Sequence, residues 1–504
     1  MPQSYIKRIL DARIYDLAVE TPIDVMSLMS GRLKNHVLLK REDLQPVFSF
    51  KIRGAYNKLL QLSVQARDRG VVAASAGNHA QGLALAAKHL GVKATIVMPR
   101  TTPAIKVDAV RARGATVVLH GDTFDEASSY AQSLVAEKGL TYIPPYDDAD
   151  VIAGQGTVAM EILRQHSKDL NAIFVPVGGG GLCAGVAAYV KYVRPEIKVF
   201  AVEPEEAACL KAALEADERV VLPQVGLFAD GVAVAQIGEE PFRVMKGVID
   251  GVITASTDEI CAAIKDIFED TRSIAEPAGA LALAGLKKYV AEQGCEGESL
   301  LAIDSGANTN FDRLRYISER TEVGEKREAV FAVTIPERPG AYSQFCQALG
   351  HRSVTEFNYR YANDKEARIF VGIQVSPDQK DRKNLAEELR GQGYSVVDMT
   401  DNEVAALHIR HMVGGHAPQV SDEVVYRFEF PERPGALVNF LSRLGGRWNI
   451  SMFHYRNHGS AYGRVLVGMQ VPESQRPDVD TFLKELGYRY WDETENAAYQ
   501  FFLA

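Results

Sequence analysis

The chain has 504 residues, of which 46% are hydrophobic and 24% charged, the balance of a globular protein with sizeable cores. Its length predicts two to four domains. The net charge of −9 argues against a nucleic-acid partner, because phosphates demand clustered Lys and Arg. No apolar run reaches membrane-spanning length, and the N-terminal sequence MPQSYIKR lacks the apolar core of a signal peptide.

The cysteines carry no C-x-x-C pairing; they are Cys183, Cys209, Cys261, Cys295 and Cys346. A sparse, unpaired set of this kind is typical of reduced thiols and not of a disulfide framework or a zinc site. We therefore expect a soluble, cytoplasmic protein.

From about residue 40 to residue 320, short apolar runs alternate with helical segments. The runs are VVAA (71–74), ATIVM (94–98), TVVL (116–119), AIFVPV (172–177), VFAV (199–202) and LLAI (300–303). Continuous apolar strands between helices are typical of parallel sheets covered on both faces, so we predict a doubly wound α/β fold. The region is large for one sheet, and we expect two lobes with a cleft between them.

The first candidate functional residue is Lys51, in the sequence SFKIRGA at 49–55. A lysine is usually a solvated surface charge. Lys51, however, lies between Phe50 and Ile52 at the start of an expected helix. An apolar setting lowers the pKa of an ammonium group, which is what Schiff-base chemistry requires.

A second candidate is the loop SAGNHAQG at 75–82, which follows an expected strand and opens a helix. Ser75 or Asn78 could simply cap that helix. The same geometry, however, offers free N–H groups and partial positive charge to a carboxylate or phosphate. Ligands bind at this edge of a parallel sheet, and the amide of Asn78 suits a phenolic oxygen.

A run of four glycines at 178–181 again separates a strand from a helix. A plain loop hardly needs such a run, because glycine carries an entropy cost. A backbone without side chains can instead surround an anion such as a phosphate. Residues 179–184 also fit the dinucleotide fingerprint G-x-G-x-x-A, with Glu203 at the end of the next strand, so a nicotinamide enzyme is an alternative.

The sequence IDSGANTN at 303–310 follows another apolar run. The asparagines of such a turn are often only caps. The four motifs together are nevertheless expected at strand ends that converge on one edge of the sheets, and capping alone does not explain all four.

Beyond the charged segment RTEVGEKRE (320–328) the chain repeats itself. IPERPGA (335–341) returns as FPERPGA (430–436), FNYR (357–360) as FHYR (453–456), VGIQV (371–375) as VGMQV (467–471), and Gly393-Tyr394 as Gly487-Tyr488. Each copy predicts the ferredoxin-like order strand, helix, strand, strand, helix, strand. A module used only for oligomerisation is the structural alternative.

Together these motifs resemble those of the fold-type II pyridoxal-phosphate family and, within it, biosynthetic threonine ammonia-lyase (threonine dehydratase). SFKxRGA, SxGNH, GGGGL and SGAN occur in the family's order, and the resemblance covers essentially the whole chain. It implies pyridoxal 5′-phosphate as cofactor and deamination of L-threonine to 2-oxobutanoate and ammonia, the first committed step of isoleucine biosynthesis. L-serine is implied as a secondary substrate.

The resemblance also implies roles for the residues of the motifs. Lys51 would bind the cofactor aldehyde covalently and then act as general base, while Phe50 packs against the ring. Asn78 would bond the 3′-oxygen, and Ser305 would face the pyridine nitrogen.

Two anions complete the implied site. The cofactor phosphate would lie on the backbone of Gly178, Gly179, Gly180, Gly181 and Leu182. The substrate carboxylate would lie on the loop of Ser75, Gly77, Asn78 and His79.

Two departures from the related serine racemases refine this interpretation. Those enzymes carry a serine at the position of Ala76 that serves as a second acid/base, and an alanine cannot move a proton. The segment Glu203-Pro204 resembles the racemase metal loop, but Cys209 stands where an aspartate ligand is expected. We therefore predict deamination, not racemisation, and no metal.

In the family the tail consists of ACT-like regulatory repeats. Isoleucine binds there and inhibits the enzyme, and valine counteracts the inhibition. The family also implies a homotetramer. The expected organisation is a catalytic domain at 1–320, a linker at 321–328, a first repeat at 329–410, a linker at 411–422 and a second repeat at 423–504. Three alternatives remain: a serine dehydratase, racemase or threonine synthase of the same cofactor class, the nicotinamide enzyme, and a non-catalytic amino-acid sensor.

Overall fold

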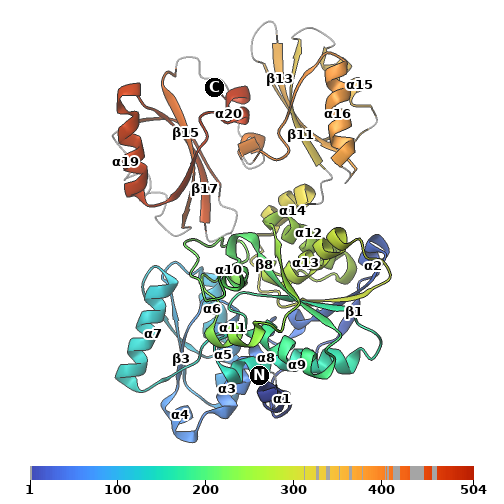
Figure 1. Ribbon diagram of the computed structural model, residues 1–504. Helices are drawn as coiled ribbons and strands as arrows, with labels where there is room; N and C mark the ends of the chain where they lie inside the picture. Colours follow the sequence, from blue (N-terminus) through green and yellow to red (C-terminus); the bar gives the residue numbers. More distant parts are fainter. Residues whose placement is uncertain are drawn as a thin grey trace. The chain divides into compact units, whose positions relative to one another are not determined.

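The computed structural model describes residues 3–311, 313–324, 328–336, 341–350, 352, 354–361, 366–376, 379–402, 404–405, 408–411, 420–431, 448–456 and 462–503. The chain forms two compact units, Met1–Ile317 and Ser318–Ala504. Figure 1 shows the elements of each unit coloured along the sequence.

A four-stranded parallel sheet forms the core of the smaller lobe of the first unit. Its strands, in the order β5-β4-β3-β6, are Thr116–Leu119, Ala94–Met98, Val71–Ala74 and Thr141–Tyr142. Buried side chains of α7 (Phe124–Lys138) cover one face. The other face is covered by α3 (Lys51–Gln61), α5 (Asn78–Leu90) and α6 (Ala104–Ala112).

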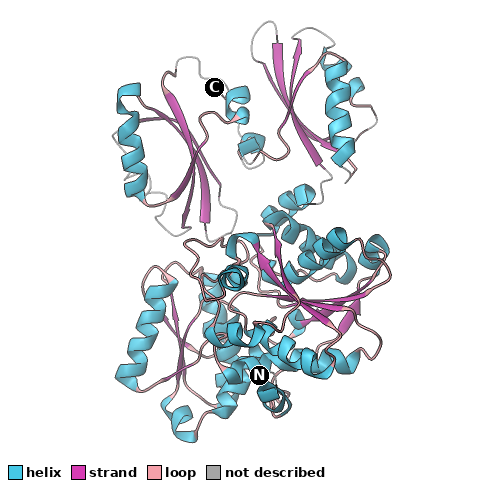
Figure 2. Cartoon of the chain, in the orientation of Figure 1, coloured by secondary structure: helices cyan, strands magenta, loops and turns pink. Residues whose placement is uncertain are grey.

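A six-stranded sheet forms the core of the larger lobe. Its order is β1 (Ile23–Val25), β2 (His36–Arg41), β10 (Ser299–Asp304), β7 (Ala172–Pro176), β8 (Lys198–Pro204) and β9 (Gly251–Ala255). All neighbours are parallel except β1 and β2. Figure 2 shows helices on both sides of this sheet.

Two separate apolar cores lie on the two faces of the larger sheet. One core contains α1 (Gln3–Leu10), α8 (Ala149–Gln165), α9 (Gly181–Val193), α10 (Cys209–Ala216) and α11 (Glu239–Met245). The other contains α2 (Ser27–Leu33), α12 (Thr257–Thr271) and α13 (Pro277–Gln293). The predicted doubly wound α/β fold is therefore confirmed. The short helix α4 (Val64–Arg69) ends before β3.

The second unit contains two four-stranded antiparallel sheets. The first repeat runs β11 (Glu328–Pro336), α15 (Ala341–Ala348), β12 (Val354–Tyr361), β13 (Glu366–Gln374), α16 (Gln379–Gly391) and β14 (Ser395–Asp398). This is the predicted ferredoxin-like order, with β12-β13-β11-β14 in the sheet. Helix α14 (Arg313–Gly324) precedes it and crosses the boundary between the units.

The second repeat has the same sheet order, β16-β17-β15-β18. Its described elements are β15 (Glu423–Pro431), β16 (Asn449–Arg456), β17 (Tyr462–Gln470), α19 (Arg476–Leu486) and β18 (Arg489–Asp492). The segment in which its first helix is predicted lies outside the described residues, as do 337–340 and 432–436 of the two ERPGA turns and 412–419 between the copies.

One face of each sheet packs against the helices of its own repeat. The opposite faces of the two sheets contribute to a further core that the repeats share. That core includes Val330, Ala332 and Phe370 of the first repeat, Val425 and Leu466 of the second, and Tyr499 and Phe502 of α20 (Ala497–Phe502). Within the described part of the chain, no helix is both long enough and apolar enough to cross a bilayer.

Candidate active site

Lys51 is the first residue of α3, next to a turn of the chain at Pro145. Its Nζ donates a hydrogen bond to the carbonyl oxygen of Pro145 at 2.9 Å and lies 5.2 Å from the centre of the Phe50 ring. Burial lowers the pKa of Lys51 to about 8, although the carboxyl group of Glu276 acts in the opposite direction. The amine is thus readily available in the neutral, nucleophilic form.

The start of α3 is held by close backbone packing. A Cβ atom at Gly82 of α5 would lie 3.2 Å from backbone atoms of Lys51, and one at Gly154 of α8 would lie 2.7 Å from the carbonyl oxygen of Arg53. Two residues along, the buried guanidinium of Arg53 pairs with the buried carboxylates of Glu42 and Glu161. These contacts fix the position of Lys51.

The loop 75–77 joins β3 to α5, and no side chain of the described residues caps this helix. The N-cap is Gly77, whose N–H donates to the hydroxyl of Ser75 at 3.4 Å. The N–H groups of the first turn are therefore available to an anion. The amide of Asn78 donates to Glu276 Oε1 at 2.6 Å and accepts from the Asn308 amide at 2.8 Å.

The side chain of His79 lies away from this loop. Its Nε2 is 2.9 Å from the carbonyl oxygen of Ile143, and the residue is buried. Burial, aided by the positive charge of Lys51, lowers the pKa of His79 to about 3. The imidazole is therefore neutral at pH 7, and only the backbone N–H of His79 can face an anion at the helix start.

Gly178, Gly179 and Gly180 lie between β7 and α9 and have no room for a side chain, and Gly181 is the first residue of α9. A Cβ atom would lie 2.2 Å from the ring of Tyr146 at Gly179, and 2.8 Å from the Cα of Val232 at Gly178. Gly180 has a φ of +92° and serves as the N-cap of α9. No described side chain caps this helix. Only the backbone, continued by the buried Leu182, can therefore surround an anion here.

Ser305 follows β10 and lies beside the residues that precede Lys51. The N–H of Phe50 donates to the Ser305 carbonyl oxygen at 3.2 Å, and Ser49 pairs with Gly306. The buried hydroxyl of Ser305 donates to the carbonyl oxygen of Ala278 at 3.2 Å. A serine hydroxyl can rotate, so it can also meet a ring nitrogen.

Two family models match the chain. "Pyridoxal-phosphate dependent enzyme" matches residues 14–306, and "C-terminal regulatory domain of Threonine dehydratase" matches 319–409 and 414–503. The biosynthetic L-threonine dehydratase IlvA of Burkholderia multivorans is 54% identical over 503 residues, 99% of both chains. That of Escherichia coli is 55% identical over 500 residues, 99% of this chain and 97% of its own.

This chain belongs to the biosynthetic threonine dehydratases. Its structure is also similar to that of the processed threonine deaminase isoform 2 of Solanum lycopersicum, with a TM-score of 0.63 and 49% identity over 64% of this chain and 88% of that one. A threonine dehydratase is a pyridoxal-phosphate-dependent enzyme, and the alternatives of a nicotinamide enzyme and a non-catalytic sensor are therefore wrong.

The residues of this dehydratase fit the cofactor. An uncapped helix start with a side-chain-free loop suits its phosphate, the desolvated amine of Lys51 suits its aldehyde, and the amide of Asn78 suits its 3′-oxygen. Glu203, which the nicotinamide alternative required, is engaged elsewhere: its buried carboxylate accepts the N–H groups of Leu210 and Lys211 at 2.7 and 2.9 Å, at the start of α10.

Glu276 is the main residue of the dehydratase site that sequence reasoning missed. It is the N-cap of α13 and is buried, and its pKa is raised to about 7 by burial and by the nearby Asp230 carboxylate. The only local signal is that this glutamate directly precedes a helix-opening proline. That pattern indicates a helix start, but it does not indicate which residue the glutamate contacts. Asn308, which belongs to the quoted SGAN motif, joins the same cluster.

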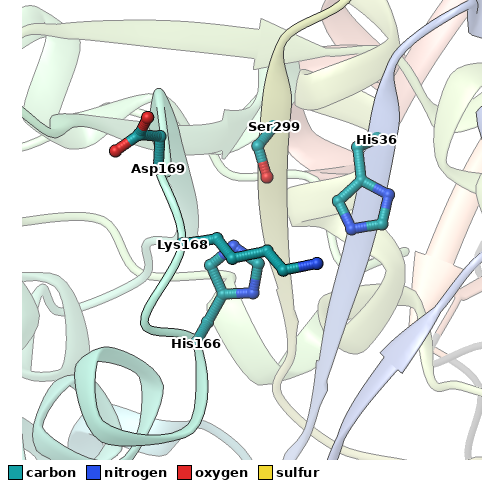
Figure 3. Close-up of a pocket in the computed structure, with 5 residues that line it drawn as sticks. All are labelled: His36, His166, Lys168, Asp169 and Ser299. Carbon is teal, nitrogen blue, oxygen red and sulfur yellow. The ribbon is translucent and has the colours of Figure 1, made fainter.

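A separate pocket lies at the opposite edge of the larger sheet (Figure 3). It is lined by His36 and Ser299, which begin β2 and β10, and by His166, Lys168 and Asp169, which connect α8 to β7. These are the amino ends of parallel strands, whereas the candidate site follows their carboxyl ends. None of the predicted site residues lines this pocket.

For the cofactor-free dehydratase, we expect uptake of pyridoxal phosphate to speed up as the pH rises, with a midpoint near the Lys51 pKa of about 8. Burial disfavours the ammonium form, so the nucleophilic amine predominates above that pH. Stopped-flow absorbance over a pH series measures the rate, with N-acetyl-lysine as the reference amine. A midpoint at the ordinary lysine value of about 10.4 would mean that the amine is not desolvated.

Proposed function

We propose that this enzyme converts L-threonine to 2-oxobutanoate and ammonia, with Lys51 as the residue that binds the cofactor and moves the proton. The observations that carry the proposal are a desolvated lysine amine, hydrogen-bonded to the carbonyl oxygen of Pro145, and two helices of the same unit, α5 and α9, that begin without a side-chain cap. One helix start suits the substrate carboxylate and the other suits the cofactor phosphate. Membership in the threonine dehydratases, whose members' names state the substrate, supports the same reaction.

Each predicted site residue has a role in this proposal. Bound pyridoxal phosphate supplies an aldehyde and an electron-withdrawing ring that stabilises negative charge at the substrate Cα. Phe50 packs against that ring, Asn78 bonds its 3′-oxygen and Ser305 faces its nitrogen. The phosphate lies on the backbone N–H groups of Gly178, Gly179, Gly180, Gly181 and Leu182.

The substrate is held and deprotonated by residues of the smaller lobe. Its carboxylate accepts hydrogen bonds from the loop of Ser75, Gly77, Asn78 and His79, the last through its backbone. The amine of Lys51 takes the proton from Cα, the electrons of that C–H bond form a Cα=Cβ bond, and the β-hydroxyl takes up a proton from the resulting Lys51 ammonium group and leaves as water. Hydrolysis of the enamine that this elimination leaves then releases ammonia and 2-oxobutanoate. L-serine would give pyruvate by the same route, and Ala76 offers no acid/base group for racemisation.

The C-terminal unit, Ser318–Ala504, supports a proposal of feedback control. Residues 1–320 would be catalytic, and the repeats 329–410 and 423–504 would bind isoleucine as inhibitor and valine as its antagonist, in a homotetramer. A regulatory-domain match over both repeats and their common core support a paired sensor. We also place the enzyme in the cytoplasm, because the four cysteines with described side chains are free thiols.

A single keto-acid assay tests substrate and regulation together. We expect L-threonine to be turned over fastest, L-serine more slowly and O-phosphohomoserine not at all, and we expect isoleucine to inhibit and valine to restore the rate. Heat-denatured enzyme is the control. Faster turnover of O-phosphohomoserine would identify a threonine synthase. A rate indifferent to isoleucine would remove the regulatory part of the proposal and leave the catalytic part standing.

A further inference from the structure

One carboxylate outside the predicted site is held from two sides. Asp230 lies in the short turn η3 (Asp230–Val232). Its Oδ2 pairs with Lys106 Nζ at 2.5 Å, and its Oδ1 with Arg313 Nη1 at 3.1 Å. Burial favours the neutral acid, but the two cations outweigh it and hold the pKa of Asp230 well below its usual range. The carboxylate is therefore ionised at pH 7.

The two cations come from different parts of the catalytic unit. Lys106 belongs to α6, which packs on the sheet of the smaller lobe, whereas Ala229, which precedes the turn, and Val232, its last residue, are buried in a core of the larger lobe. Arg313 is the first residue of α14. Asp230 thus ties the smaller lobe and the start of α14 to a turn that is anchored in the larger lobe.

The same turn is in contact with both sides of the candidate active site. A Cβ atom at Gly231 would lie 3.5 Å from Glu276 Oε1 and 3.9 Å from Asn78 Nδ2. The Cα of Val232 is the atom that leaves no room for a side chain at Gly178. The turn therefore lies next to the Asn78–Glu276 pair and packs closely against the glycine loop at Gly178.

We propose that Asp230 is a positioning residue of the dehydratase: its ion pairs with Lys106 and Arg313 hold the turn 230–232 against Gly178 and Glu276. The turn then keeps the phosphate loop and the Asn78–Glu276 pair at the spacing that the cofactor needs. This role rests on the proposed cofactor site. This positioning role differs from a contribution to fold stability, because partly exposed ion pairs add little to the free energy of unfolding. The side chains of Lys106 and Asp230 are 23% and 30% exposed.

The test compares Lys106→Met and Arg313→Met with wild-type enzyme. We expect each variant to raise the cofactor dissociation constant and the KM for threonine about fivefold, with a smaller change in kcat at saturating cofactor. Lys106→Arg keeps the charge and should restore both constants to within twofold of wild type. Thermal midpoints confirm that each variant is folded before it is compared.

The matched control is Lys34→Met, which breaks an exposed pair of the larger lobe, Lys34–Glu296 at 2.7 Å. It should leave both constants unchanged. Wild-type constants in Lys106→Met and Arg313→Met, an equal loss in the control, or no recovery in Lys106→Arg would each overturn the role of Asp230. The proposed cofactor site fails in a different way, namely if wild-type enzyme itself shows no bound cofactor in its visible spectrum.

Discussion

Replacement of Lys51 by alanine should lower threonine turnover by about a thousandfold or more, because no other amine can take its place. The only cofactor-directed lysine predicted from the sequence is Lys51, and its Nζ is the desolvated amine that contacts Pro145. Alanine removes a charge that burial disfavours, so the protein should remain folded. The rate of 2-oxobutanoate formation and the visible absorption of the purified protein measure the effect.

Lys138→Ala is a suitable control for this variant. Lys138 is an exposed residue in the last turn of α7 of the smaller lobe, and its loss should change neither the rate nor the colour. A Lys51→Ala enzyme that still produces 2-oxobutanoate at a rate near that of wild type would show that the catalytic amine lies elsewhere.

The substitution Gly179→Ala should lower the affinity for pyridoxal phosphate by about a hundredfold, which corresponds to ~2.7 kcal/mol. The added Cβ would lie 2.2 Å from ring atoms of Tyr146, so either the ring or the glycine loop must move. Tyr146 follows Pro145, whose carbonyl oxygen accepts the Lys51 hydrogen bond, so the displacement also disturbs the amine. Spectral titration of cofactor-free enzyme measures the affinity.

The control for this glycine is Gly31→Ala in α2. A Cβ atom at Gly31 meets nothing within 4 Å, and the helix tolerates alanine well. Its cofactor affinity should equal that of wild type. Unchanged affinity in Gly179→Ala would mean that the tetraglycine loop does not hold the phosphate.

Six strands of the catalytic unit could be predicted because their sequences are continuous apolar runs between helices, whereas β1, β2, β6 and β9 were not predicted. β3, β4 and β5 begin and end at the predicted residues, whereas β8 extends from Lys198 to Pro204 because it pairs with β7 on one side and β9 on the other. The strand β2 is one of those that were not predicted. Its sequence HVLLKR ends in charges, and Lys40 is nevertheless buried because Glu161 neutralises it.

The residues of the candidate site could be predicted where they belong to a short sequence motif. They could not be predicted where their role depends on a partner that is distant in the sequence. Lys51, Asn78, the glycines and Ser305 all lie in short motifs that follow strands or open helices. Glu276 is 198 residues from Asn78, and the sequence gives no sign that they meet. Asp230, Lys106 and Arg313 are likewise brought together only by the fold.

His79 illustrates a different limit of sequence reasoning. Its motif predicts that it lies beside the substrate carboxylate, and it does follow Asn78 at the start of α5. The direction of its side chain depends on packing, which places the ring against the Ile143 carbonyl oxygen. The motif identifies the backbone position and leaves the side-chain contact open.

Borohydride reduction of the coloured wild-type enzyme, followed by peptide mass mapping, tests the central claim most directly. Reduction makes the bond between cofactor and lysine permanent, so the modified residue can be read from the peptide masses. We predict a cofactor-sized mass increase on the peptide that contains Lys51 and on no other. Modification of a different lysine, such as the buried Lys40, or a protein that stays colourless in excess pyridoxal phosphate, would contradict the account.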